Sequence, residues 1–271
     1  IMNETFRALL EEATFTKEIL ASGVTQIRKA NYTRKGVYFQ CFTNLSTGLE
    51  RIGKLCMILD YYIKNNGKFP NMNFVKVQIG HDLELLYSNS KAVINDHNIS
   101  FIFSPNLDDV LHQEIIRILS TFAKGNRYAN INFLVSQIKE NDPIFDWHEK
   151  IDKQLYATRV SEKLKKKIET NAEVIDILLS LNTLIIHSSE SRKEINTVRE
   201  ASIQTGKNNA VSKYRQLYLL QIIRYWVEIL IELQYIASNI NKNDIPYFTE
   251  IFTIFYNEDS YFLTRKTFDE L

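Results

Sequence analysis

A histidine and an aspartate, His81 and Asp82, open the segment GHDLELLY at residues 80–87. An imidazole titrates near neutral pH, so His81 is a candidate general base with Asp82 as its carboxylate partner. The alternative is structural, because an aspartate at a helix start accepts backbone N–H groups and favours the helix dipole. Adjacent residues at a helix start point in different directions, so the spacing favours the structural role.

A second group comprises Glu50 and Lys54, four residues apart in GLERIGKLCMILDYYI, and Arg127 and Tyr128 in FAKGNRYANI. Residues four apart share a helix face, and an exposed Glu–Lys pair contributes only about 0.3–0.5 kcal/mol. If the pair faces the bundle and meets His81 or Arg127, we expect a polar network able to hold a phosphate or a nucleotide. A solvated surface pair is the competing interpretation.

A basic run, EKLKKKIE, contains Lys165 and Lys166 and is a candidate nucleic-acid patch. Clustered cations contact phosphates, and Tyr156 nearby could stack on a base. Glu162 and Glu169 flank the run, and the formal net charge is only +1, from 33 basic and 32 acidic residues. A solvated helical face is therefore the alternative, and the chain as a whole has no general attraction to nucleic acid.

Other motifs carry little chemistry. Asp108 and His112 lie four residues apart and supply two of the three or more ligands that a metal needs. The DWHEK segment at 146–150 spaces its side chains by two, which does not share a helix face. The QTGKNNA segment at 204–210 is expected to be a loop, and it lacks the earlier glycine and the following Ser or Thr of a phosphate-binding loop. We predict no metal site and no cofactor.

Long helices are predicted to position these groups. Apolar residues recur at spacings of three and four across residues 35–64, which indicates one buried face of a helix that ends at Asn65–Gly67. Further helices are expected over 3–29 and, as the most apolar of all, over 213–240. Glycine occurs only 8 times and proline 4 times, which favours few and long elements.

The remaining segments are less regular. Asp142 and Pro143 are predicted to cap and start a helix, and the pattern stays helical to about residue 200. Residues 92–104 fit either a short strand-like excursion or an irregular loop, and a short helix is expected after Pro246. The sequence predicts an all-α fold, a bundle of long antiparallel helices.

The environment follows from the cysteines and the apolar segments. Cys41 and Cys56 fall on one predicted helix, roughly 22 Å apart, so they cannot bond to each other. Two buried free thiols suit a cytoplasmic location. The N-terminal residues do not form a signal peptide, and charged residues interrupt the most apolar segment, so no membrane association is expected.

Three segments follow one another along the chain: the predicted helix with Glu50 and Lys54, then GHDLELLY, then the predicted helix that ends in Arg127 and Tyr128. This order resembles the HEPN superfamily, helical bundles common in bacterial defence, toxin–antitoxin and nucleotidyltransferase-associated proteins. The resemblance covers roughly residues 33–140. It implies a HEPN-like bundle at 1–141 with a C-terminal helical region at 142–271 packed on it, or one continuous domain, and it implies a homodimer.

One feature of that family is missing. Its nuclease members carry an arginine followed, after four to six residues, by a histidine, and these groups meet across the dimer to cleave RNA without metal. No histidine here has an arginine at that offset; Lys76 stands five residues before His81 but lacks the planar fork of arginine. We therefore expect a non-catalytic binding or regulatory protein for RNA or a nucleotide in a defence or toxin–antitoxin system.

Two alternatives remain open. The first is a divergent ribonuclease that uses His81 and Arg127 as catalytic residues. The second is a scaffold whose C-terminal helices bind a protein partner through a large apolar patch over residues 213–256.

Overall fold

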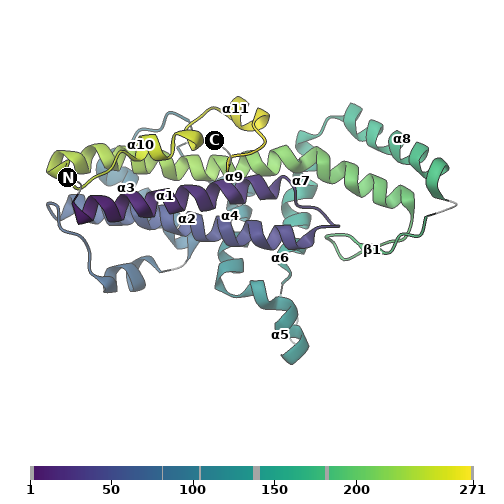
Figure 1. The fold of residues 1–271 in the computed structure, drawn as a ribbon, viewed down its shortest axis with the longest axis horizontal. Coiled ribbons are helices and arrows are strands. Elements are labelled where there is room, and N and C mark those ends of the chain that lie inside the picture. Colours follow the sequence, from purple (N-terminus) through teal and green to yellow (C-terminus); the bar gives the residue numbers. More distant parts are fainter. Residues whose placement is uncertain (1–2, 81, 104, 137–140, 181–182, 270–271) are drawn as a thin grey trace.

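Three long helices run side by side along the molecule (Figure 1): α1 (Glu4–Ile27), α2 (Lys35–Lys64) and α9 (Val198–Asn241). The computed structural model describes residues 3–80, 82–103, 105–136, 141–180 and 183–269, and this part of the chain is almost entirely helical. The all-α prediction is confirmed. The boundaries of α2 coincide with the predicted 35–64, because its apolar stripe and its terminal Asn65–Gly67 agree.

Shorter elements surround these helices. Before α9 they are η1 (Phe74–Ile79), α3 (Leu83–His97), α4 (Val110–Lys124), η2 (Asn126–Tyr128), α5 (Ala129–Ser136), α6 (Pro143–Trp147), η3 (His148–Asp152), α7 (Lys153–Arg159) and α8 (Glu162–Leu179). After α9 they are α10 (Phe248–Ile251), η5 (Thr253–Phe255) and α11 (Asp259–Thr264). The predicted start at Asp142 and Pro143 is confirmed, since the Asp142 carboxylate accepts the Ile144 N–H at 2.9 Å.

Glycines bring α1 and α2 into close contact. A Cβ atom at Gly23 would lie 2.7 Å from Leu45 Cγ, and one at Gly48 would lie 2.6 Å from Leu20 Cδ2. Each helix therefore presents a glycine to a leucine of the other. This reciprocal contact fixes the spacing and the register of the two antiparallel helices.

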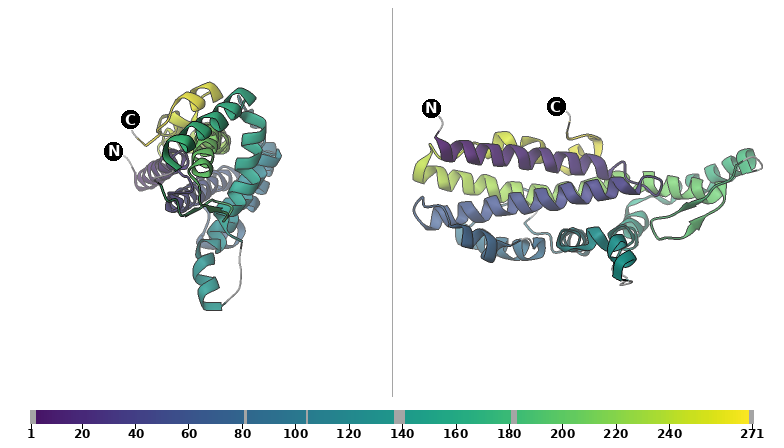
Figure 2. Two further views of the ribbon diagram at one scale, coloured as in Figure 1. Left: turned by 90° about the vertical axis from the view of Figure 1, so that its right-hand side faces the viewer. Right: turned by 60° about the horizontal axis from the view of Figure 1, so that its bottom comes forward.

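Helix α9 runs from one end of the molecule to the other. Its 44 residues give a length of about 66 Å at a rise of about 1.5 Å per residue. It runs in the direction of α2: Tyr38 and Arg215 meet near one end, the Cys56 thiol donates to the Trp226 carbonyl at 3.7 Å, and the Tyr62 hydroxyl bonds Asp244 at 3.2 Å near the other. Figure 2 shows α9 continuing past α1 and α2 to carry α8.

The predicted loop at 204–210 is wrong, because these residues lie inside α9. Gly206 does not break the helix there. A Cβ atom at this position would lie 2.6 Å from Ile168 Cγ2, so the glycine allows α8 to pack closely on α9. The helix instead begins at Val198, after Thr197, which caps it and forms a capping box with Glu200.

The helical prediction for residues 143 to about 200 is confirmed as far as Leu179, the end of α8, and is wrong for the segment with β1 and β2. After α8 the chain forms a short antiparallel pair, β1 (His187–Ser188) with β2 (Glu194–Ile195). The turn between them is held by the Ser189 hydroxyl, which accepts the Lys193 N–H at 3.0 Å, and by Arg192 at φ +62°. Local side-chain bonds of this kind compete with a helix.

The ambiguous segment 92–104 divides at Asn98, whose left-handed conformation ends α3. The residues after it are irregular, and the Glu228 carboxylate of α9 holds them by accepting the Ile102 N–H at 2.6 Å. The loop interpretation is therefore right for residues 99–103, and the helical portion before it was missed.

A single hydrophobic core joins side chains from both halves of the chain, including Phe42, Trp147, Trp226 and Phe262. The division at residue 141 stays a prediction. Cys41 and Cys56 are buried free thiols and do not form a disulfide with each other, as expected. Within the described ranges, no helix combines the length and the hydropathy that crossing a bilayer requires.

Candidate functional site

Glu50 and Arg127 line one pocket of about 470 Å³, which we call the α2–α4 pocket. Its wall consists of Thr43, Ser46, Thr47 and Glu50 from α2, Phe122, Ala123 and Lys124 from α4, and Arg127 from η2. Helix α2 places Thr43, Thr47 and Glu50 on one face by its periodicity of three to four residues. Residues almost 80 positions apart in the sequence thus share a polar cavity.

Lys54 does not line this pocket but orients Glu50. Its ammonium lies 2.7 Å from Glu50 Oε1, and the two side chains are only 18% and 19% exposed. The pair is therefore a sheltered contact rather than the solvated surface pair that was the alternative interpretation. A carboxylate held by a lysine in this way has a fixed direction at the pocket wall.

Asp82 ties the start of α3 to α4. Its carboxylate caps α3 by accepting the Glu84 and Leu85 N–H groups, accepts the Ser120 hydroxyl at 3.0 Å, and forms an ion pair with Lys124. Burial alone would raise the pKa of Asp82, but the bonds from Lys124, the Leu85 amide and Ser120 outweigh it and lower that pKa. Asp82 is thus a structural cap that also positions a lysine of the α2–α4 pocket.

His81 lies outside the described residues, so its contacts are not part of the site geometry. Arg127 and Tyr128 are exposed, and the Arg127 guanidinium lies 5.1 Å from the centre of the Tyr128 ring. Within the described part of the chain, Arg127 has no acidic partner. The guanidinium at the pocket rim is available for an anionic ligand.

Lys165 and Lys166 lie on α8, which packs on α9 (Figure 1), and neither lysine lines the α2–α4 pocket. Lys165 pairs with Glu162 at 2.6 Å and lies 5.4 Å from the centre of the Tyr156 ring. Lys166 is exposed on the same helix. The structure therefore brings Lys165 to the aromatic residue that the sequence suggested, and it separates both lysines from Glu50 and Arg127.

The other sequence candidates are engaged elsewhere. His112 contacts Asp109, the cap of α4, and its Nε2 lies 3.0 Å from Gln221 Oε1, so Asp108 is not its neighbour in a shared site. Asp108 instead accepts the Tyr87 hydroxyl at 2.9 Å. The part of the chain that the structure describes holds no group of three His, Cys, Asp or Glu side chains suited to a metal.

The predicted apolar patch over residues 213–256 is wrong. This stretch of α9 is mostly buried, and large exposed apolar side chains within it are limited to Tyr235, Ile240 and Tyr247. The apolar residues there form the core because α9 packs on α1, α2 and α11. Exposed apolar side chains gather instead on α5 and at the end of α8.

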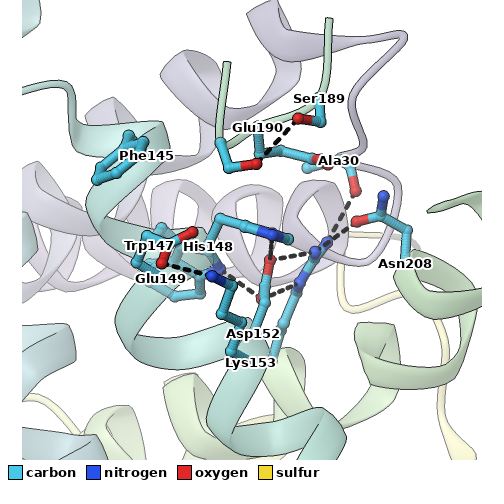
Figure 3. A network of polar contacts seen from close by, with 12 residues as sticks. Ala30, Phe145, Trp147, His148, Glu149, Asp152, Lys153, Ser189, Glu190 and Asn208 are labelled. Carbon is cyan, nitrogen blue, oxygen red and sulfur yellow. Dashed lines mark hydrogen bonds and ion pairs between the residues drawn. The ribbon is translucent and has the colours of Figure 1, made fainter. Parts of the chain in front are cut away.

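A buried charged network that includes Asp152, Glu190 and Asn208 (Figure 3) is the main feature that the sequence did not predict, and Arg215 of α9 is at its centre. Arg215 is fully buried and forms two bonds with the Asp152 carboxylate, at 2.7 Å from Nε and 2.6 Å from one Nη. It also donates to the Ala30 carbonyl at 2.8 Å and to Asn208 at 2.7 Å. Trp147 Nε1 donates to the same Asp152 at 3.1 Å.

A second buried carboxylate, Glu190, completes the network. The Tyr38 hydroxyl donates to it at 3.4 Å and Gln204 donates at 2.8 Å. Burial alone would lower the pKa of Arg215, but Asp152, with Tyr38 and Glu190, outweighs it and raises that pKa above the ordinary value. Burial raises the pKa of Tyr38 well above its ordinary value, so the phenol stays a neutral donor.

A smaller cavity of about 130 Å³ adjoins this network, and we call it the α7–α9 pocket. It is lined by His148, Asp152, Lys153, Tyr156, Gln204, Lys207, Asn208, Val211 and Arg215. Sequence reasoning missed it because Asp152 and Arg215 are 63 residues apart and each looks like an ordinary surface charge. The one usable signal was an arginine inside the most apolar helical run.

Comparison with known proteins gives no match to a family model, to a curated protein or to a solved structure. The functional argument therefore depends on the geometry of the two pockets.

Proposed function

We propose that this protein is a HEPN-like, non-catalytic binding protein whose α2–α4 pocket holds a phosphate group of an RNA or a nucleotide. The supporting observation is that Glu50, Lys124 and Arg127, from three elements, line one cavity. A bacterial defence or toxin–antitoxin setting and a homodimer belong to the same proposal. The dimer is tested by light scattering at micromolar concentration, where a clean monomer counts against it.

The side chains of the pocket suit a phosphate. Arg127 offers a planar fork of N–H donors, and Lys124 adds a second cation that Asp82 holds in place. The Thr43 and Thr47 hydroxyls can donate to further phosphate oxygens. Because Lys54 already pairs with Glu50, the one carboxylate at the wall repels the anion less than an unpaired one would.

The absence of catalysis is supported by the sequence, which lacks the arginine–histidine spacing of the nuclease members. Among the described residues, the wall of the α2–α4 pocket contains no histidine. The residues that remain can bind and orient a phosphate diester, but they do not include an evident proton-transfer pair.

Binding of a fluorescein-labelled single-stranded RNA, followed by anisotropy at low salt, tests the proposal. We expect Arg127→Gln to weaken binding about tenfold or more, because a charge-assisted bond contributes about 1.5–3 kcal/mol. The matched control is Arg7→Gln, an equal loss of charge on an exposed position of α1, which should bind as the wild type does. Equal weakening by both variants, or no RNA binding by the wild type, would contradict the proposal.

A second candidate, the divergent ribonuclease, is favoured by one observation. Asp82, the residue after His81, bonds to Lys124 at the wall of the pocket that Arg127 also lines. An RNA cleavage assay comparing the wild type with His81→Ala decides it. No cleavage by the wild type, or equal cleavage by both proteins, excludes this candidate.

A further inference from the structure

We propose that the α7–α9 pocket is a second binding site, and that it takes the phosphate group of a phosphate monoester. It shares no lining residue with the α2–α4 pocket. The inference does not depend on RNA binding at that other pocket.

The wall of the pocket includes a rigid cationic group. Arg215 is fully buried, and its guanidinium donates to Asp152, to the Ala30 carbonyl and to Asn208. Four bonds to these partners use four of its five N–H donors, which leaves one for another acceptor. A charge fixed in this way needs no reorganisation when an anion arrives.

Lys207 supplies a second cation at the rim. It is exposed, and it has no acidic partner among the residues that the structure describes. Its ammonium lies 5.6 Å from the centre of the Tyr156 ring, and that ring is also approached by Lys165 at 5.4 Å. Two lysine ammonium groups, of Lys165 from α8 and Lys207 from α9, therefore lie close to the Tyr156 ring at the mouth of the cavity.

His148 supplies a buried ring nitrogen that lacks a hydrogen-bond partner in the described structure. This Nδ1 lies 3.6 Å from Asp152 Oδ2, which is ion-pair distance for a protonated imidazole but too long for a hydrogen bond. Figure 3 shows this imidazole beside the Asp152 carboxylate. A buried nitrogen of this kind calls for a partner, and a ligand oxygen at the pocket can provide it.

Charge and size select the ligand. Three basic side chains line the pocket with the single carboxylate of Asp152: Arg215, which that carboxylate binds, Lys153, which pairs with Glu149 at 2.5 Å, and Lys207, which has no acidic partner among the described residues. The volume of about 130 Å³ is small, and it suits a compact anion such as a phosphate group. A phosphate monoester has its second pKa near about 6 and is mostly a dianion at neutral pH, unlike a diester. The remainder of the ester would lie outside, against Tyr156 and Val211.

Isothermal titration calorimetry of the full chain tests this site with three probes: inorganic phosphate, glycerol 3-phosphate and adenosine 5′-monophosphate. We expect binding of at least one of them at millimolar concentration or below, and at least tenfold weaker binding by Lys207→Gln. The matched control, Lys166→Gln, removes an exposed lysine of α8 outside the pocket and should bind as the wild type does. Tighter binding of adenosine 5′-monophosphate than of the other probes would identify a nucleotide as the source of the phosphate.

Three outcomes would overturn the inference: no binding of any probe at millimolar concentration, equal binding by wild type and Lys207→Gln, or equal weakening by both lysine variants. Arg127→Gln should leave phosphate binding here intact. Failure at this pocket is therefore distinguishable from failure of the proposed RNA site.

Discussion

Removal of the Asp152 carboxylate tests the buried network most directly. In Asp152→Ala, the fully buried Arg215 loses both bonds of its bidentate partner, and Trp147 Nε1 loses its acceptor. Breaking a buried ion pair costs about 3–5 kcal/mol, and an unsatisfied N–H adds about 1 kcal/mol or more. Glu190 remains near the guanidinium and offsets part of this loss. We expect the free energy of unfolding to fall by about 3–5 kcal/mol.

Urea denaturation followed by circular dichroism at neutral pH measures this change. The matched control is Glu162→Ala, which breaks an ion pair with Lys165 in which the Glu162 side chain is 87% exposed, and its midpoint should equal that of the wild type. The double variant Asp152→Ala/Arg215→Met removes both charges. It should lose less stability than the sum of the two single variants, because no charge is left buried alone.

A loss below about 1 kcal/mol in Asp152→Ala would refute the reasoning, since it would mean that Arg215 finds water or another acid at no cost. Strict additivity in the double variant would refute it as well. Either result would show that the two side chains are not coupled as the bond lengths imply.

Two further predictions concern helix contacts and pH. Gly48→Ala should destabilise the protein by about 1–2 kcal/mol in thermal unfolding, because the new Cβ would lie 2.6 Å from a Leu20 methyl carbon. The control is Gly36→Ala, whose Cβ would have no atom within 4 Å and which should be neutral or stabilising. An equal effect of both would contradict the close contact. The pKa of Asp82 is lower in the folded than in the unfolded protein, so its ionised carboxylate stabilises the fold. This contribution to the free energy of unfolding is complete above the unfolded-state pKa of about 3.9 and is lost as pH falls through the lower folded-state pKa. The stability difference between wild type and Asp82→Asn should therefore be constant from pH 7 to pH 5 and shrink below about pH 4 in urea titrations; a difference that does not change with pH would contradict it.

The sequence predicted the helices whose local signals and tertiary packing agree. Helix α2 has an apolar stripe and clear end signals, and the start of α6 has Asp142 and Pro143 in their preferred positions. The failures occurred where packing overrides composition. Gly206 and its polar neighbours look like a loop, yet Ile168 packs against that glycine within a continuous helix. The turn held by Ser189 depends on side-chain bonds that periodicity does not reveal.

The candidate site was predictable in part. The pairing of Glu50 with Lys54 follows from helix periodicity, and the order of the motifs suggested that Arg127 would share a site with them. The link from Asp82 to Lys124 was not predictable, because it depends on how α3 crosses α4. The Arg215 network could not be predicted for a similar reason. The ion pair between Arg215 and Asp152 joins elements that are far apart in the sequence, and no periodic pattern of residues indicates it.

The reaction rates of the two buried thiols of α2 report how the helical bundle opens. Burial raises the pKa of both Cys41 and Cys56, so the reactive thiolate becomes available to an alkylating agent only when the surrounding structure opens. Cys41 lies in the field of Arg215, towards one end of α9, while Cys56 bonds the Trp226 carbonyl farther along. If the amino-terminal half of α2 separates first, Cys41 should be labelled faster than Cys56. If the whole bundle opens in one step, the two labelling rates should be similar.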